Sequence, residues 1–334
     1  MKISIKLALL TAMFIGTGCS HANNTVSKSV SSMVDLSNAK NGCAGRYTIQ
    51  LPKNAVQFGG GDIFNSFEIN SVTGSSVDAL NANYDAQKEY FSHGVSTITV
   101  ESPLKKIGSK SYRIFSGKPG TVVGAPLLLK FWVLDQGVLF TFEIPYMPEM
   151  KDVVFKEMDM IIANLSARNN NSVPTSKGVC ILNGFIKDSD SLFRKSSHSI
   201  AYTLSGMPSV KMSMKVDAVA QQAPDLIART DAKLKRAGIF YLTLTSYKTI
   251  RKGQKNQTTG ELDGVEYVSK APMKGKDGII ANWEHGGTAH KTYDPAVLFN
   301  FDTGYTPSNV KTTDMTKTEA LKTYELIINT IKKF

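Results

Sequence analysis

The sequence lacks a long hydrophobic run after its N-terminal segment, and only three of its 334 residues are cysteines. No later segment reaches the roughly 18 apolar residues of a membrane-spanning helix, so the exported part is predicted not to be embedded in a bilayer. Three cysteines are too few for a disulfide-dense scaffold, and the length favours two domains that bury their cores without one. The 42% hydrophobic and 20% charged residues are typical of a folded, water-soluble protein.

The familiar catalytic and nucleotide-binding motifs are missing. The sequence contains no Gly-x-Ser-x-Gly elbow, no His-Glu-x-x-His helix, no phosphate loop ending in Gly-Lys-Ser or Gly-Lys-Thr, and no dinucleotide-binding glycine pattern. The run Gly59-Gly60-Gly61 is interpreted as a turn, because no helix start with phosphate-binding polar residues follows it. Together these absences leave no catalytic residue and no cofactor site to propose.

One segment, Asn-Trp-Glu-His-Gly-Gly at 282–287, carries residue types that could do chemistry. Its His-Gly-Gly is found in lipase oxyanion loops, and Glu284 could orient His285, but no candidate serine nucleophile accompanies them. His285 and His290 could be two metal ligands, yet no spaced cysteine or carboxylate set completes a site, so no metal is predicted. We interpret the segment as a strand end followed by a glycine turn. Two other histidines are interpreted as surface or hydrogen-bonded structural residues: His93 and His198.

Acidic residues are scarce relative to basic ones, at 28 against 39, which gives a formal net charge of +11 and makes anionic partners plausible. The densest cluster holds seven cations from Lys233 to Lys255, with no Asp or Glu between Asp231 and Glu261. Such a run usually marks a solvated face, but it could also steer an acidic protein surface or lie near anionic lipid. No nucleic-acid-binding module is recognisable. The candidate partner-binding residues on this stretch and the following loop are Lys248, Arg251, Lys252, Lys255, Lys274 and Lys276.

The N-terminus reads as a secretory signal. Lys2 and Lys6 precede the mostly apolar stretch Leu7–Ile15, and small residues follow. Cleavage before Cys19 would leave a lipidated cysteine as a membrane tether, although the residue three positions earlier is not the leucine of a usual lipobox. Cleavage after Ala22 would leave a free protein. Both cuts stay open, and both predict a periplasmic protein.

The two remaining cysteines, Cys43 and Cys180, are predicted to form a disulfide in an oxidising compartment. A lipidated Cys19 would account for the odd cysteine. The alternative is two buried free thiols, and a thiol titration of the unreduced protein distinguishes the two states.

Hydrophobic periodicity gives the domain plan. The signal occupies 1–22, a flexible lead 23–41, an N-terminal α+β domain 42–168, a linker of asparagine, serine and proline 169–177, and a C-terminal α+β domain 178–334. Each domain is predicted as an antiparallel sheet packed with helices, in a plan repeated once. Helices are expected at 77–91, about 150–165, 224–238 and 316–331, the last with a capping box between Thr316 and Glu319. Strands are expected at 46–52, 67–72, 111–116, 127–134, 138–144, 181–186, 210–216, 241–250, 265–269, 279–284 and 297–301, with Asp135-Gln136-Gly137 as a hairpin connection.

Several short patterns together resemble one family. They are Cys43-x-Gly45-Arg46-Tyr47-x-Ile49-x-Leu51-Pro52, Gly178-x-Cys180-x-Leu182-x-Gly184-Phe185-Ile186, Leu226-Ile227-x-Arg229, Leu262-Asp263-Gly264-x-Glu266, Trp283-Glu284-x-Gly286 and Asp294-Pro295-x-Val297-Leu298-x-Asn300-x-Asp302-x-Gly304. In this order they are similar to the cognate immunity proteins of type VI secreted lipase effectors, over nearly the whole mature chain.

The resemblance implies a periplasmic protein of two related α+β domains that is not an enzyme. It implies a protein partner, a phospholipase or lipase effector, which the immunity protein would block at its lid and active-site entrance. Gly264, Glu266, Trp283 and Gly304 are interpreted as fold determinants. A competing interpretation is a periplasmic protein that binds a small molecule or lipid in the groove between its halves. Charge reversal at Lys252 and Lys255 is predicted to slow association if the basic cluster steers the partner.

Overall fold

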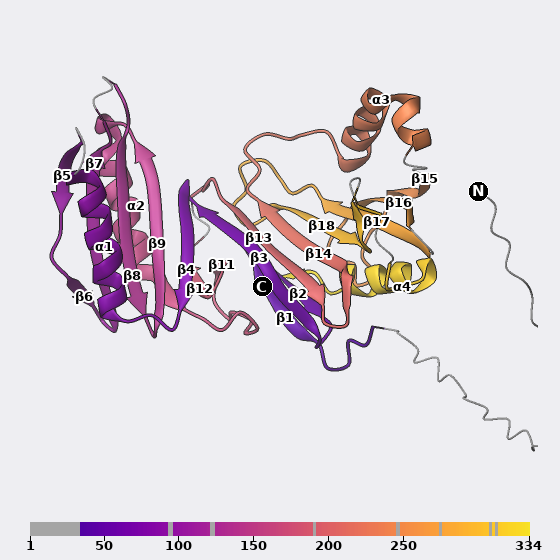
Figure 1. Cartoon of the computed structure of the whole chain (residues 1–334), viewed down its shortest axis with the longest axis horizontal. Helices are drawn as coiled ribbons and strands as arrows, with labels where there is room; N and C mark the ends of the chain where they lie inside the picture. The colour runs from indigo at the N-terminus through magenta and orange to yellow at the C-terminus, as the bar shows by residue number, and fades with distance from the viewer. Residues whose placement is uncertain are drawn as a thin grey trace, which may run out of the picture. The chain divides into compact units, whose positions relative to one another are not determined.

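One antiparallel sheet of 13 strands forms the centre of the described structure (Figure 1). The computed structural model describes residues 34–92, 96–120, 124–189, 192–244, 248–273, 276–306, 309–310 and 313–334. The strands run in the order β15-β16-β17-β18-β14-β13-β3-β4-β9-β8-β7-β5, with β6 paired to β7. Every neighbouring pair is antiparallel, which together with four helices confirms the predicted α+β class.

The strands of this sheet are β3 Ala55–Phe64, β4 Phe67–Thr73, β5 Thr97–Glu101, β6 Lys105–Ile107, β7 Lys110–Lys118, β8 Leu127–Asp135, β9 Val138–Tyr146, β13 Ser197–Leu204, β14 Met207–Asp217, β15 Lys248–Gln254, β16 Val265–Met273, β17 Lys276–His285 and β18 Ala296–Asp302. Smaller sheets are built from β1 Lys40–Ala44, β2 Tyr47–Leu51 and β21 Lys332–Lys333; from β10 Leu165–Ala167, β11 Gly178–Ile181 and β12 Gly184–Lys187; and from β19 Tyr305–Thr306 and β20 Asn309–Val310.

The helices pack on both faces of the central sheet. They are α1 Val77–Ser92, α2 Lys151–Asn164 after the short 3-10 turn Pro148–Met150, α3 Leu226–Leu244 and α4 Lys317–Ile328. Buried side chains of α1 pack against Trp132 of β8, whereas those of α2 pack against the neighbouring Phe131, which points to the opposite face. Figure 1 shows α3 and α4 on opposite sides of β16 and β17. None of the helices among the described residues has both the length and the apolar character needed to cross a membrane.

The hairpin of β8 and β9 and the capping box of α4 were predicted from local sequence. Asp135 pairs with Val138, so the connection has two residues instead of three: Gln136 and Gly137, at φ 46° and 76°. These angles suit the twist of a tight hairpin. Asp135 extends the strand because its buried carboxylate accepts hydrogen bonds from the Ser109 hydroxyl and the Ala167 amide, at 3.0 and 2.8 Å. In α4, the Thr316 side chain accepts from the Glu319 amide, and the capping box is complete, as predicted.

The interpretation of Gly59-Gly60-Gly61 as a turn was wrong, because these glycines lie inside β3. They pair with Ser199, Ile200 and Ala201 of β13. A Cβ on Gly60 would lie 2.7 Å from the Ser199 carbonyl oxygen, so this position requires glycine for the close approach of the two strands. The need for glycine at position 60 is imposed by β13, which lies 140 positions later in the sequence, so the residues around Gly60 do not indicate it.

Two other predicted strands differ. The segment 181–186 is not one strand but the end of β11, a turn with Asn183 at φ 59°, and β12. The strand expected at 241–250 begins only at Lys248, because α3 runs to Leu244 through a break at Gly238, where φ is 77°. The apolar residues after Gly238 form a short run, and a run of this length does not show whether the segment is a strand or a helix.

The hydrophobic cores exchange segments between the two halves of the chain. The largest core contains side chains of β1, β2 and β3 together with those of β13, β14, β16–β18 and α4. A second core combines β4, β7–β9 and α2 with Val179, Ile181 and Ile186 of the later hairpin β11–β12. The limits 42–168 and 178–334 stay a prediction, and in the structure each half of the sequence contributes to the core of the other.

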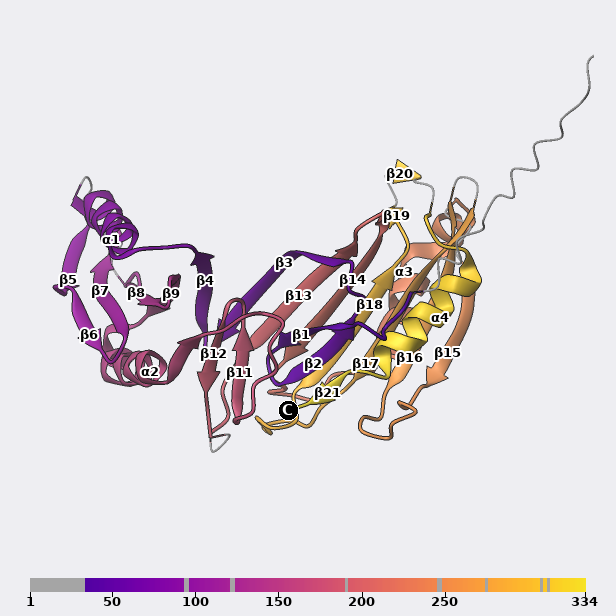
Figure 2. The ribbon, with the colours of Figure 1, turned by 90° about the horizontal axis from the view of Figure 1, so that it is seen from below.

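The predicted disulfide lies where these exchanged segments meet. Cys43 of β1 and Cys180 of β11 are bonded, with Cα atoms 5.8 Å apart. Gly45 exchanges two backbone hydrogen bonds with Cys180, of 3.0 and 2.7 Å. Next to it, the Arg46 guanidinium donates to the Gly178 carbonyl at 3.0 Å and to the buried Asp188 carboxylate at 2.6 Å. Figure 2 shows the C-terminal strand β21 joining β1 and β2 beside this junction.

Candidate functional site

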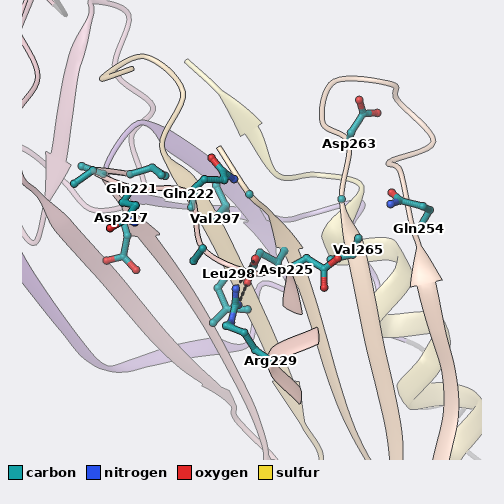
Figure 3. Close-up of a pocket in the computed structure, with 18 residues that line it drawn as sticks. Asp217, Gln221, Gln222, Asp225, Arg229, Gln254, Asp263, Val265, Val297 and Leu298 are labelled. Carbon is teal, nitrogen blue, oxygen red and sulfur yellow. Dashed lines mark hydrogen bonds and ion pairs between the residues drawn. The ribbon is translucent and has the colours of Figure 1, made fainter. Parts of the chain in front are cut away.

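A concavity on the α3 side of the sheet has a volume of about 590 Å³ (Figure 3). Its walls come from the loop between β14 and α3, the first turn of α3, and the adjoining ends of β15, β16, β17 and β18. Apolar side chains such as Val265 and Leu298 line it together with polar ones. We call this concavity the α3 pocket.

An ion pair spans the α3 pocket. The Arg229 guanidinium of α3 donates to both carboxylate oxygens of Glu284 on β17, one at 3.2 Å and the other closer. Arg229 also donates a hydrogen bond to the Pro224 carbonyl, which fixes the guanidinium to the loop just before α3. The Glu284 side chain is 10% exposed and that of Arg229 is 40% exposed. The pair therefore ties α3 to the sheet and leaves one face of the guanidinium accessible from the pocket.

The rim of the α3 pocket is polar and mixed in charge. Asp225 caps α3 by accepting from the Ala228 amide at 2.8 Å, which holds its carboxylate in place. Asp217 is paired with Lys215 at 2.8 Å. Asp263 on the opposite rim is exposed, as are three glutamine side chains, at positions 221, 222 and 254. Such a surface can form oriented hydrogen bonds with another protein at little cost in ordering its own backbone.

One wall of the α3 pocket depends on a contact between a glycine and a tryptophan. The Trp283 indole N–H donates to the Lys255 carbonyl at 2.7 Å. A Cβ on Gly264 would lie 2.4 Å from the same indole nitrogen, so only glycine fits there. The interpretation of both residues as fold determinants agrees with this packing. The same holds for Gly304, at φ 106°, where a Cβ would lie 2.8 Å from the Ser209 Cβ.

The predicted basic cluster is divided between α3, which carries its first three cations, and β15, an edge strand of the sheet, which carries the next three. Arg251 is paired with Glu266 at 2.8 Å and with Glu325 of α4 at 2.7 Å. Lys252 is paired with Asp231 of α3 at 2.5 Å, and its ammonium lies 5.6 Å from the centre of the Tyr267 ring. These two cations are thus balanced by carboxylates within the chain. Their charge adds little to a steering field, because each pair is nearly neutral at a distance.

The other predicted cations have different surroundings. Lys248 is exposed at the start of β15 and Lys255 is partly exposed just after it. Neither side chain has an ion pair among the interactions of the described residues. Lys276 is the first residue of β17. Lys274 lies outside the described residues. The structure thus places Lys248, Arg251 and Lys252 on β15 and Lys255 directly after it, next to the α3 pocket through Gln254.

The two histidines considered as metal ligands, His285 and His290, have separate partners and do not face a common site. His285 Nδ1 lies 2.9 Å from the Asp263 carbonyl oxygen, and its Nε2 lies 3.1 Å from the Asp294 carboxylate. His290 packs on Phe193, with ring centres 5.2 Å apart. Across the described ranges, no three His, Cys, Asp or Glu side chains group at metal-binding distance.

Two further histidines were predicted to be structural. His198 is buried and its Nδ1 lies 2.9 Å from Asp62, as expected of a hydrogen-bonded structural residue. His93 lies outside the described residues.

Asp294 is expected to make folding stability depend on pH in the acidic range. Burial raises the pKa of its carboxyl, but hydrogen bonds from Thr288 and His285, with the charges of His285 and Lys333, hold the pKa below its usual 3.8. A depressed native pKa adds stability above the unfolded-state pKa and loses it as pH falls through the native value. The stability difference between the wild type and Asp294→Asn should therefore be constant near pH 6 and shrink below about pH 4. Urea titrations from pH 3 to 7 measure this difference. A difference that stayed constant down to pH 3 would contradict it.

Sequence reasoning missed the pair of Arg229 and Glu284. Both residues were part of the recognised patterns, but they are 55 positions apart and nothing local indicates that they meet. Only the antiparallel pairing that sets β17 under α3 makes the contact. The one available signal was that one recognised pattern contains a basic residue, Arg229, and another contains an acidic residue, Glu284, so that the two could form an ion pair.

Comparisons with known proteins converge on one group. Residues 172–333 match the family model described as the Tle cognate immunity protein 4 C-terminal domain. Three similar solved chains come from the apo structure of the immunity protein TplEi of the type VI secretion system of Pseudomonas aeruginosa, the crystal structure of a Tle4–Tli4 complex, and TplEi complexed with a peptide named L. Their identities are 18%, 19% and 20%, with TM-scores of 0.72, 0.74 and 0.69. Each alignment covers 90% of this chain and 98%, 98% and 99% of the other. No curated protein matches significantly.

Proposed function

We propose that this chain, which belongs through residues 172–333 to the Tle cognate immunity protein 4 family, is the immunity protein of a type VI secreted phospholipase or lipase effector. It would bind the effector in the periplasm and cover the lid and entrance of the active site, so that lipid cannot enter. The protein would act without catalysis of its own. Its partner is a protein, and no cofactor is required.

The family match is the observation that carries this proposal. The matched segment contains every residue that lines the α3 pocket and all of β15, so the part of the chain that belongs to the family holds the candidate surfaces. The fold shared with TplEi, and with a chain taken from a Tle4–Tli4 complex, extends over both halves. An effector and its immunity protein form such a complex in that relative.

The physical design suits a blocking protein. Inhibition by coverage needs a surface that is already ordered, because each side chain or loop that must be fixed on binding weakens the complex. Around the α3 pocket, Arg229 is fixed by Glu284 and Pro224, and Trp283 by Lys255. The disulfide joins the exchanged segments at the centre of the molecule. The surface therefore has few degrees of freedom left to lose.

The proposal is tested by mixing the mature protein with its cognate lipase effector, which is to be sought among the products of the neighbouring genes. We expect a stoichiometric complex on size-exclusion chromatography and complete loss of lipase activity on phospholipid vesicles at equimolar protein. A lipase from an unrelated secretion cluster is the control and should keep its activity. If the cognate lipase remained active with micromolar protein present, the immunity function would be rejected.

The basic strand gives a kinetic prediction. Charge reversal at Lys252 and Lys255 should lower the association rate about tenfold at low salt and weaken its salt dependence. It removes the unpaired cation Lys255 and turns the neutral pair of Lys252 and Asp231 into two negative charges, which opposes encounter with an acidic partner. Lys252→Glu also breaks the pair with Asp231, so Lys255→Glu alone is the cleaner variant. Lys53→Glu, an exposed cation between β2 and β3, is the matched control. Stopped-flow association rates measured at 20 and 200 mM salt show whether these cations steer the partner. Equal rates for Lys255→Glu and Lys53→Glu would dismiss the steering role.

A further inference from the structure

A second pocket, of about 380 Å³, lies where strands β3 and β4 separate. The two strands pair only through residues 62–64 and 67–69; beyond these, β3 pairs with β13 and β4 with β9. Gln57 of β3 and Thr73 of β4 both lie outside the paired stretch and line the pocket. The rest of the lining comes from Lys40, Tyr202, Asn183 and residues 168–171. We call it the asparagine pocket, because four of its lining residues are asparagines.

Two cations line the asparagine pocket, and neither makes a salt bridge with a carboxylate of the described residues. The Arg168 guanidinium donates only to neutral carbonyls, those of Gly184 at 3.3 Å, Asn169 at 2.9 Å and Ser172 at 2.6 Å. The Lys40 ammonium donates to the Ala55 carbonyl. Burial lowers the pKa of Arg168 to about 10 and also lowers the pKa of Lys40. Their positive charges are thus partly desolvated. The Asp62 carboxylate acts on Arg168 through its charge but makes no hydrogen bond with it, whereas Arg251 and Lys252 on β15 form direct ion pairs.

The neutral groups of the asparagine pocket are held in place. Asn170 and Asn183 hold each other: the Asn170 side-chain nitrogen donates to the Asn183 side-chain oxygen at 2.9 Å, and the Asn183 backbone N–H donates to the Asn170 side-chain oxygen at 2.7 Å. The Asn169 side chain accepts from the Asn171 amide at 2.9 Å. Burial raises the pKa of Tyr202 to about 12, so its hydroxyl remains protonated and able to donate. The asparagine run that reads as a linker in the sequence is therefore an ordered, donor-rich wall.

We propose that the asparagine pocket binds the carboxylate of an aspartate or glutamate side chain on the partner protein. The guanidinium and the ammonium would supply charge, and the amide and phenol groups would supply directed hydrogen bonds, a donor set that suits a planar oxyanion. This inference rests on the proposed function, since it names a contact with the effector. The bound carboxylate would compensate charges from both cores, because Lys40 belongs to β1 and Arg168 follows β10.

A carboxylate fits better than a lipid phosphate for a structural reason. The lining comes from strands β1, β3, β4 and β13 and from residues 168–171 and 183 between strands, and none of it comes from an amphipathic helix. A side chain projecting from a protein loop can enter such a recess without removing a headgroup from a bilayer. Inorganic phosphate and anionic lipid remain the alternatives that the experiment separates.

Binding of the cognate effector by charge-altered variants tests the proposal. Arg168→Gln and Lys40→Gln should each weaken the complex roughly ten- to hundredfold, because a charge-assisted hydrogen bond to the partner is lost. Asn171→Asp, which places a carboxylate at the pocket while leaving the bonds of Arg168 intact, should weaken it similarly. Lys53→Gln removes an exposed charge elsewhere and should bind like the wild type. Unfolding midpoints of all variants identify any that fail to fold.

The free chain provides a second measurement that does not need the effector. Titration of labelled wild-type protein with sodium glutarate, a small dicarboxylate, should shift the backbone amide signals of Asn170 and Asn183, and Asn171→Asp should abolish the shift. Inorganic phosphate and vesicles of phosphatidylglycerol serve as competing probes.

The outcomes separate the two claims. Effector affinities unchanged in all three pocket variants would overturn the inference and leave the immunity function standing. No complex with wild type would reject the immunity function, and the glutarate shifts would then decide alone whether the pocket binds a carboxylate. Phosphate or vesicle binding that requires Arg168, without any glutarate shift, would overturn the carboxylate assignment.

Discussion

Replacing both Cys43 and Cys180 with serine is expected to lower the free energy of unfolding by about 4 kcal/mol. The bond closes a loop of 137 residues, and a long loop has more conformational freedom to lose in the unfolded chain. The bond also joins β1 to β11, which belong to segments exchanged between the two cores. Reduction should therefore weaken the attachment of both hairpins at once.

Urea unfolding of the oxidised wild type and of the double serine variant measures the difference, with wild type in excess reductant as the control for the serine substitutions. The reduced wild type and the variant should unfold at similar midpoints. The backbone bonds between Gly45 and Cys180, and the pair of Arg46 with Asp188, stay in place in both. A loss below about 1 kcal/mol would mean that these contacts hold the junction without the bond, and would contradict the entropic argument.

Features set by neighbouring residues could be predicted from the sequence. The helix Val77–Ser92 follows from apolar residues three and four positions apart, and the hairpin of β8 and β9 follows from a glycine between two apolar runs. The capping box of α4 needs only Thr316 and Glu319. Each of these signals is contained within a few consecutive residues, so no knowledge of the rest of the fold is required.

Features set by distant residues could not be predicted. The glycines of β3 read as a turn until β13 is placed beside them, and the exchange of hairpins between the cores has no local signature. Antiparallel pairing of strands far apart in sequence is decided by the whole sheet, not by either strand. The plan of two separate domains was based on the order of elements along the chain, and that order gave no indication that one sheet runs through both halves.

The basic cluster illustrates the same limit at the candidate site. In sequence it is a stretch without acidic residues, bounded by Asp231. In space, Asp231 itself pairs with Lys252, while Glu266 and Glu325 come from β16 and α4 to pair with Arg251. A count along the chain gives net charge but cannot place the acids that fold back onto it. Conversely, the polar stretch at residues 169–171, which gave no functional signal in the sequence, lies beside two cations that make no salt bridge with the described residues.

Gly264→Ala is expected to destabilise the protein by about 3 kcal/mol and to weaken effector binding. The added Cβ would lie 2.4 Å from the Trp283 Nε1 and 2.5 Å from the adjacent ring carbon, so one of the two backbones or the indole must move. Trp283 cannot swing away cheaply, because it is fully buried and its N–H donates to the Lys255 carbonyl. Overpacking of this kind typically costs 1–3 kcal/mol, and loss of the indole hydrogen bond adds about 1 kcal/mol.

The change would also reach the proposed binding surface. Gly264 lines the α3 pocket, and Glu284, next to Trp283, carries the pair with Arg229. A displaced indole would therefore disturb the pair and the rim around Asp263. The effector should bind this variant at least tenfold more weakly even at temperatures where the variant is fully folded.

Two matched glycines provide the controls. Gly286→Ala, in the same pocket, places its Cβ 3.6 Å from the Gln222 side-chain nitrogen, and Gly59→Ala places it 3.8 Å from the Ala201 Cβ, both ordinary contact distances. Both variants should change the unfolding free energy by less than about 1 kcal/mol, because neither meets a steric conflict. Denaturant unfolding and effector affinity, measured on all three variants, separate a steric effect at Trp283 from a general effect of losing glycine. Equal stability of Gly264→Ala and Gly286→Ala would show that Trp283 is free to repack, and would remove it as the determinant of the pocket wall.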